Sequence, residues 1–116
     1  MKKINIIKEN TDYYRIIKNN KPFKYKEYSI FLEKNNDNKY YQFGFSVSKK
    51  ICNAVNRNKI KRRLKDIIDK KDYKNNFNCI IMVNRSIMEK SYDEMQEDLY
   101  HCFKILKIFK GEDYEK

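Results

Sequence analysis

The residues best suited to chemistry in this chain are the positively charged side chains of residues 49–65. This stretch holds eight Lys and Arg residues and no Asp or Glu, in a chain with a formal charge of +11. Positive charge at this density repels itself unless a polyanion neutralises it. Three of the five arginines lie here, and arginine grips a phosphate through two parallel hydrogen bonds. The stretch therefore predicts a binding site for a nucleic-acid backbone.

A helix over residues 53–69 is the element expected to position these charges. At 100° per residue, one arc of such a helix is apolar and must face the core. It consists of Ile60, Leu64, Ile67 and Ile68. The adjoining arc is cationic, and it consists of Asn58, Lys61, Arg62 and Lys65. Ordinary solvated faces mix charges of both signs, and this face carries no acid before Asp66. We therefore predict a folded basic helix that lies on nucleic acid.

No set of residues predicts catalysis by protein side chains. His101 is the only histidine, and no second group that could share acid–base work flanks it. Asp66, Asp69 and Asp72 recur every three residues, but pairing with the neighbouring lysines accounts for them better than a metal site does. We expect neither a catalytic residue nor a tightly bound metal in this protein.

The remaining elements form the frame around the basic helix. Asn10-Thr11-Asp12 offers a cap for a helix over residues 12–19. Strands are expected over residues 28–32, 40–48 and 77–84, and the last of these is apolar on both faces, as in a buried central strand. Ser91 and Glu94 form a capping box for a helix that reaches about Phe109. This order of elements indicates an α+β sandwich, with helices packed on a small sheet.

Length and composition favour one domain over residues 1–116, with an ordered core at about residues 10–110. The three cysteines (Cys52, Cys79 and Cys102) are too few and too dispersed for a disulfide framework or a zinc site. We expect them to be reduced. No apolar run is long enough to span a membrane, so we expect a cytoplasmic protein without a membrane partner.

Residues 44–62 resemble the signature of the protein component of bacterial ribonuclease P. That signature reads approximately G-x-S-V-S-K-K and then A-V-x-R-N-x-I-K-R-x-x-R. The first part is present as Gly44-Phe45-Ser46-Val47-Ser48-Lys49-Lys50. The second part is present as Ala54-Val55-Asn56-Arg57-Asn58-Lys59-Ile60-Lys61-Arg62. The last arginine of the motif is replaced by Lys65, and a second aromatic residue usual in the first helix is replaced by Ile17.

The resemblance implies an α-β-β-β-α-β-α fold with a small mixed sheet. It adds a short strand near residues 24–26 and a left-handed crossover between parallel strands, although handedness rules alone predict a right-handed one. It also implies that a large RNA carries the catalytic site and holds the Mg²⁺ ions, and that the protein assists removal of the 5′ leader from precursor tRNA. The protein alone is expected to be a monomer.

Two binding surfaces follow from this resemblance. The surface for the catalytic RNA, called the basic surface below, comprises Lys49, Lys50, Arg57, Asn58, Lys61, Arg62 and Lys65. The surface for the single-stranded leader, called the leader face, comprises Tyr13, Tyr14, Ile17, Gly44, Ser46 and Ser48. On the strand over residues 40–48, the small residues of the leader face alternate with core residues, so a nucleic-acid backbone is expected to approach closely. Of the two tyrosines, we assign Tyr13 to the cleft and expect at least one of the pair to be core packing.

Two other functions remain compatible with the charge pattern. A DNA-binding module would insert residues 53–69 into the major groove, but a strand rather than a helix and a tight turn precedes them. A ribosome-associated basic protein would have the same charge, but the motif does not specifically support it.

Overall fold

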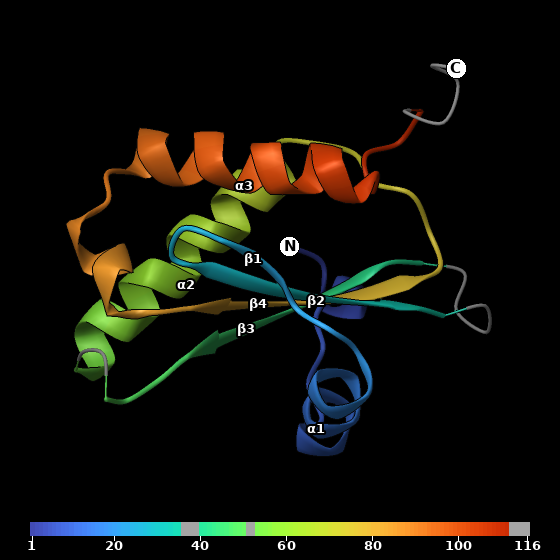
Figure 1. The fold of residues 1–116 in the computed structure, drawn as a ribbon, viewed down its shortest axis with the longest axis horizontal. Helices are drawn as coiled ribbons and strands as arrows, with labels where there is room; N and C mark the ends of the chain where they lie inside the picture. The colour runs from blue at the N-terminus through green and yellow to red at the C-terminus, as the bar shows by residue number, and fades with distance from the viewer. Residues whose placement is uncertain (36–39, 51–52, 112–116) are drawn as a thin grey trace.

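The computed structural model describes residues 1–35, 40–50 and 53–111. The helices and strands follow the expected order (Figure 1). They are α1 (Asn10–Asn19), β1 (Phe23–Tyr25), β2 (Tyr28–Lys34), β3 (Gln42–Val47), α2 (Ala54–Asp69), β4 (Phe77–Val83) and α3 (Tyr92–Leu106). Short 3₁₀ helices at Lys3–Asn5 and Arg85–Glu89 precede α1 and α3. The α-β-β-β-α-β-α fold is confirmed, including the short strand that the resemblance implied.

The four strands form one mixed sheet in the order β1-β2-β4-β3. The β1–β2 and β2–β4 pairs are antiparallel, and the β3–β4 pair is parallel. Because β3 and β4 run in the same direction, the chain must cross back over the sheet between them, and α2 makes this crossover. The basic helix is therefore tied at both ends to the two strands that it connects.

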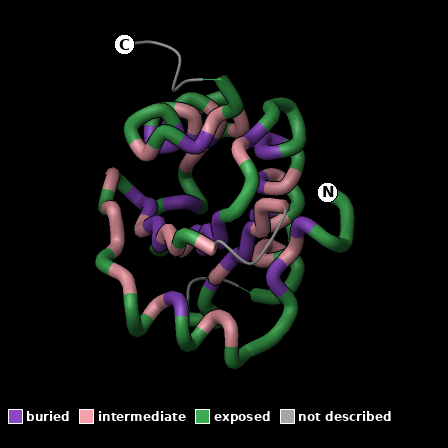
Figure 2. The backbone as a smooth tube through the Cα atoms, turned by 90° about the vertical axis from the view of Figure 1, so that its right-hand side faces the viewer, coloured by how far each residue is buried: buried purple, intermediate pink, exposed green. Residues whose placement is uncertain are grey.

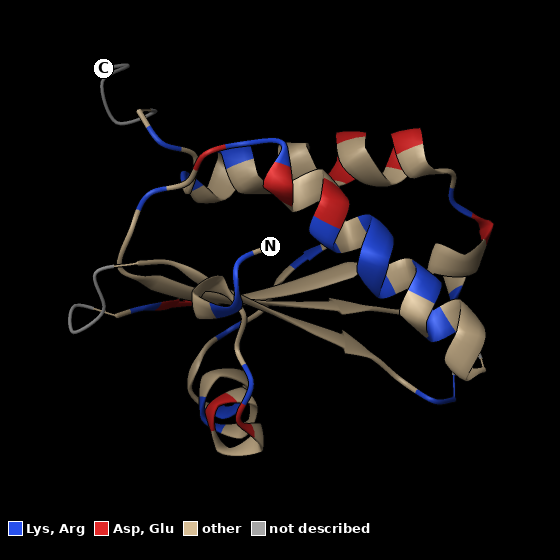
Figure 3. Cartoon of the chain, turned by 180° about the vertical axis from the view of Figure 1, so that it is seen from behind, with Lys and Arg blue, Asp and Glu red and all other residues tan. Residues whose placement is uncertain are grey.

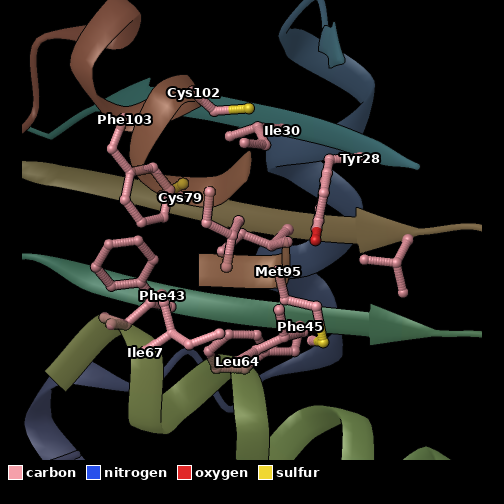
Figure 4. Close-up of a cluster of buried hydrophobic side chains, with 14 of the residues drawn as sticks. Tyr28, Ile30, Phe43, Phe45, Leu64, Ile67, Cys79, Met95, Cys102 and Phe103 are labelled. Atoms are coloured by element: carbon pink, nitrogen blue, oxygen red, sulfur yellow. The ribbon is translucent and has the colours of Figure 1, made fainter. Parts of the chain in front are cut away.

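Helices cover both faces of the sheet. Figure 1 shows α2 and α3 over one face and α1 over the other. The larger core lies between the sheet and the α2–α3 layer, where Phe43, Leu64 and Phe103 are fully buried (Figure 4). A smaller core under α1 centres on Ile16 and Ile80, both fully buried. Figure 2 shows that the buried positions gather between these layers.

The start and the apolar arc of α2 are confirmed, and so is the capping box of α3. Asn53 caps α2 by accepting a hydrogen bond from the Asn56 amide at 2.9 Å. The buried residues of this helix are Ile60, Leu64, Ile67 and Ile68. Ser91 and Glu94 exchange both hydrogen bonds of a capping box, at 3.1 Å and 3.0 Å. Local sequence signals were sufficient here because each cap involves residues only three apart.

Several element boundaries were wrong. Helix α1 begins at Asn10, so the expected cap Asn10-Thr11-Asp12 lies inside its first turn and no side chain caps it. Helix α3 ends at Leu106, because Lys107 turns into the left-handed conformation with a φ of 58°. Strand β2 continues to Lys34, where pairing with β4 adds hydrogen bonds that local patterning does not reveal.

The described cysteines are buried. Cys79 and Cys102 are free thiols. Burial raises the pKa of both, that of Cys102 to about 11, so neither is an activated thiolate at neutral pH. Cys52 lies outside the described residues. Within the described residues, no helix is long and apolar enough to cross a membrane.

Candidate nucleic-acid interface

The basic surface is built on α2 and the turn before it. Lys49 and Lys50 lie in the turn after β3 and are exposed, as are Asn58 and Arg62 on α2. Arg57, Lys61 and Lys65 are half-buried. Figure 3 shows Lys and Arg along the outer side of α2, with acidic residues starting at its C-terminal end. The apolar arc of the helix thus holds the neighbouring cationic arc at the surface.

The described part of the protein offers these cations no carboxylate partner. Among the described residues, no Lys or Arg of residues 49–65 forms an ion pair. The first acid of the helix, Asp66, accepts a hydrogen bond from the Tyr92 hydroxyl. Surface cations usually find opposite charges nearby. Here the charge is left for an external anion, and a phosphate backbone satisfies this best.

Two contacts extend the basic surface beyond α2. The Lys65 ammonium lies 6.0 Å from the centre of the Phe45 ring on β3, so this lysine also packs against the sheet. Arg85, in the 3₁₀ helix after β4, donates a hydrogen bond to the Lys50 carbonyl at 3.4 Å. Arg85 was not among the predicted site residues. No local signal could have found it, because 35 residues separate it from Lys50.

On the opposite face of the sheet, Tyr13 of α1 lies against Gly44 of β3. A Cβ atom at Gly44 would come within 2.8 Å of the Tyr13 ring. The Tyr13 hydroxyl accepts a hydrogen bond from the Phe45 amide at 3.1 Å and donates one to the Ile7 carbonyl at 3.3 Å. Burial raises the pKa of Tyr13. The ring is therefore held in a fixed position at the outer edge of β3.

This packing corrects one expectation about the leader face. Gly44 is buried, so a nucleic-acid backbone does not approach it directly. Its missing side chain instead makes room for Tyr13. Of the other small residues, Ser46 is half-buried and Ser48 is exposed, and the Ser48 hydroxyl accepts a hydrogen bond from the Lys50 amide at 3.1 Å.

The two neighbouring tyrosines of α1 have different surroundings. Tyr13 is half-buried against the small core under α1, where Ile17 also packs. Tyr14 is 68% exposed, and the Lys18 ammonium lies 5.5 Å from the centre of its ring. The structure therefore brings Tyr13, Ile17 and Gly44 together and leaves Tyr14 on the outer side of the helix.

Arg15 directly follows Tyr14 of the leader face, and its charge is already neutralised within the protein. Its guanidinium contacts the Asp12 carboxylate at 2.6 Å and the Glu33 carboxylate at 3.0 Å. These hydrogen bonds raise the pKa of Arg15 and lower that of Glu33. Glu33 also accepts a hydrogen bond from the side-chain amide of Asn78, at 2.9 Å.

The residues considered for catalysis have ordinary structural surroundings. His101 is exposed, and its ring centre lies 4.7 Å from that of Tyr25. Asp69 pairs with the amino group of Met1 at 2.7 Å. Within residues 1–35, 40–50 and 53–111, no group of three or more His, Cys, Asp or Glu is placed to hold a metal ion.

The fold and these surfaces define a class of α+β nucleic-acid-binding protein, and comparison with known proteins identifies the family. The family model for ribonuclease P matches residues 1–107. The ribonuclease P protein component of Macrococcus caseolyticus is 37% identical over 112 residues, which cover 94% of this chain and 96% of that protein. The corresponding protein of Staphylococcus epidermidis is 36% identical, with the same coverage. The chain belongs to the ribonuclease P protein family.

Solved structures agree with this family. The Staphylococcus aureus RNase P protein superposes with a TM-score of 0.82 at 30% identity, covering 91% of this chain and 98% of that one. A mutant of that protein, described as defective in mRNA degradation activity, gives 0.83 at 30% identity, with 92% of each chain covered. The RNase P protein from Thermotoga maritima, at 20% identity and a TM-score of 0.75, shares the fold.

Proposed function

We propose that this chain is the RNA-binding protein subunit of ribonuclease P, and that it assists removal of the 5′ leader from precursor tRNA in the cytoplasm. The catalytic RNA performs the hydrolysis and binds the basic surface. One observation carries the proposal: the stretch that contains the family motif holds eight cations in 17 residues, and they form no ion pair with a carboxylate of the described residues. Each phosphate that these cations neutralise releases a counterion, which favours assembly.

The protein acts on the reaction indirectly. In the holoenzyme, Mg²⁺ would supply the activation of the attacking water, and the catalytic RNA would hold it. The residues of this chain reduce the repulsion between two RNAs. Asn58, exposed between Arg57 and Lys59, donates and accepts hydrogen bonds and suits a 2′-hydroxyl or a base edge. The protein itself acts as a monomer.

The leader face supplies the second contact. The Tyr13 ring offers a rigid surface on which a leader base stacks, and Ser46 and Ser48 continue this surface along β3. Stacking on an aromatic ring tolerates any base, which suits a subunit that must accept many precursor tRNAs. The exposed ring of Tyr14 with Lys18 borders the same helix and serves as an outer contact.

Reconstitution tests this function. The protein is combined with a bacterial ribonuclease P RNA at low Mg²⁺, and release of the 5′ leader from precursor tRNA is measured. We expect the protein to raise the cleavage rate well above that of the RNA alone. A folded protein that gives no stimulation would contradict the proposal.

The same preparation distinguishes the alternatives. Tight binding to duplex DNA without stimulation would favour a DNA-binding module. Selective binding to ribosomal RNA without stimulation would favour a ribosome-associated protein. One S. aureus relative is described as a mutant with defective mRNA degradation activity. An mRNA is therefore a useful additional substrate, assayed with and without the catalytic RNA.

A further inference from the structure

Helix α1 carries Tyr13, Tyr14 and Ile17 of the leader face, yet few apolar contacts hold this helix on the sheet. Ile16 is the only residue of α1 that is fully buried, and Tyr13 and Ile17 are partly buried beside it. A ten-residue helix on one buried side chain can roll about that contact. Contacts on its two flanks therefore help to set its orientation.

The two flanks of α1 are held in different ways. On one flank, the Tyr13 ring fills the space above Gly44, and its hydroxyl bonds to the β3 edge. On the other flank, a polar cavity of about 500 Å³ lies between Arg15 and the sheet, and Glu33 and Asn78 are among the residues that line it. A cavity of this size leaves room for α1 to roll in this direction. The ion pair between Arg15 and Glu33 is the direct link across it.

The sheet is built to hold Glu33 in place. Glu33 and Asn78 are direct partners in the β2–β4 register. Asn78 is only 2% exposed, it donates to the Glu33 carboxylate at 2.9 Å, and its own side-chain oxygen has no hydrogen-bond partner. A buried polar oxygen without a partner costs stability. The side-chain amide of Asn78 thus holds in place the Glu33 carboxylate that pairs with Arg15.

Arg15 thus contacts Glu33 in a directed manner. Its Nη2 and Nε atoms reach the two carboxylate oxygens at 3.0 Å and 3.3 Å, and its Nη1 reaches Asp12 on the preceding turn at 2.6 Å. A guanidinium held in a fork geometry restrains direction as well as distance. This contact restrains the rotation of α1 about its axis.

We propose that Arg15, through Glu33 and Asn78, is a positioning residue that sets the leader affinity of ribonuclease P without touching RNA. The proposal rests on the proposed function, since it concerns how the leader face is oriented. Roll of α1 toward the cavity would lift the Tyr13 ring from Gly44 and disturb the stacking surface. The alternative is that Arg15 contacts a leader phosphate, as a basic residue beside an RNA site ordinarily would.

The two roles predict opposite effects for Glu33. If Arg15 positions α1, then Arg15→Gln and Glu33→Gln break the same contact and both weaken leader binding. If Arg15 binds phosphate, Glu33→Gln removes a competing carboxylate and leaves leader binding equal or stronger. Single-strand binding weakens with salt, and each phosphate contact contributes about 0.7 to the slope of log K against the logarithm of the salt concentration. Loss of one phosphate contact therefore makes this slope shallower by about 0.7, whereas loss of a positioning contact leaves the slope unchanged.

The experiment uses the holoenzyme reconstituted with a bacterial ribonuclease P RNA. Affinities for precursor tRNA and for mature tRNA are measured over a range of salt concentrations for the wild type, Arg15→Gln, Glu33→Gln and the charge-swapped pair Arg15→Glu with Glu33→Arg. Lys21→Gln is the matched control, because it removes an exposed positive charge just beyond α1. Thermal unfolding of each protein checks that it is folded.

We expect each single variant to lower the affinity for precursor tRNA by roughly three- to ten-fold, as for a partly exposed ion pair. Mature tRNA binding and the salt dependence should not change, and the charge-swapped pair should recover at least part of the loss. A reduced salt dependence in Arg15→Gln, or unweakened leader binding in Glu33→Gln, would overturn the proposal. If the wild type itself fails to prefer precursor over mature tRNA, it is the proposed function that fails.

Discussion

Arg62 on α2 and Arg15 on α1 are the same side chain in two regions with opposite electrostatic surroundings. Arg62 is exposed on the cationic face of α2, and no carboxylate of the described residues forms an ion pair with it. Arg15 is also exposed, but it forms ion pairs with Asp12 and Glu33. The comparison indicates that a guanidinium can bind an external anion freely only where the fold leaves it without an internal partner. Counting basic residues would have treated the two alike.

The two surfaces also differ in how far they are fixed before RNA binds. The long cationic side chains of α2 must lose rotational freedom when they grip phosphates. Tyr13 has already lost it, because Gly44 and two hydrogen bonds hold its ring. We therefore expect the basic surface to adapt to a phosphate backbone and the Tyr13 part of the leader face to present a fixed shape. Variants that affect one surface and spare the other test this difference.

The largest expected effect is on the basic surface. Arg62→Ala should weaken assembly with the catalytic RNA by roughly 1–3 kcal/mol, or about 5- to 150-fold, because it removes a charge-assisted contact to phosphate. Direct binding of labelled catalytic RNA measures this. Arg15→Ala is the matched control and should leave assembly unchanged. Equal losses for both would show that the two arginines do not differ as the structure indicates.

A smaller effect, on leader binding, is expected where the Tyr13 ring packs against Gly44. Gly44→Ala places a Cβ within 2.8 Å of the Tyr13 ring, so the ring must move and its two hydrogen bonds weaken. We expect leader-bearing precursor tRNA to bind about 1–2 kcal/mol more weakly, which is on the order of one lost stacking contact. Mature tRNA binding should not change.

A double-mutant cycle shows whether Gly44 acts through Tyr13. Tyr13→Ala should weaken binding of the leader-bearing substrate selectively, and adding Gly44→Ala should cost nothing further. Additive losses would mean that Gly44 contacts RNA in its own right. Equal loss for precursor and mature tRNA in Tyr13→Ala would reject the assignment of Tyr13 to the leader face.

The smallest expected effect separates the ring of Tyr13 from its hydroxyl. Tyr13→Phe keeps the stacking surface but removes the acceptor for the Phe45 amide. We expect leader affinity to fall by about 0.5–1.5 kcal/mol, the range for one hydrogen bond, with assembly unaffected. If leader affinity stays at the wild-type value, stacking alone explains the contribution of Tyr13 to leader binding. The hydrogen bonds that hold its ring in place would then contribute nothing to that affinity.

The sequence predicted the elements whose evidence is local. The apolar period of residues 60–68, the Asn53 start of α2 and the Ser91–Glu94 capping box were all correct, because each depends on residues within one or two turns. The boundaries that were wrong depend on distant residues. Strand β2 reaches Lys34 because Phe77 pairs with it, and no pattern in residues 28–34 reports that partner.

The candidate site shows the same division. The sequence by itself determined the family motif, the basic helix and its lack of acids, because these are properties of consecutive residues. Only the tertiary structure decided that Arg85 reaches Lys50, that Gly44 seats Tyr13 and that Arg15 is neutralised by Glu33, 18 residues away. Side-chain partners across a sheet are set by strand register and helix placement, which arise from packing of the whole core. For that reason the positive charge of residues 49–65 could be predicted from the sequence, whereas the fixed position of Tyr13 on the leader face could not.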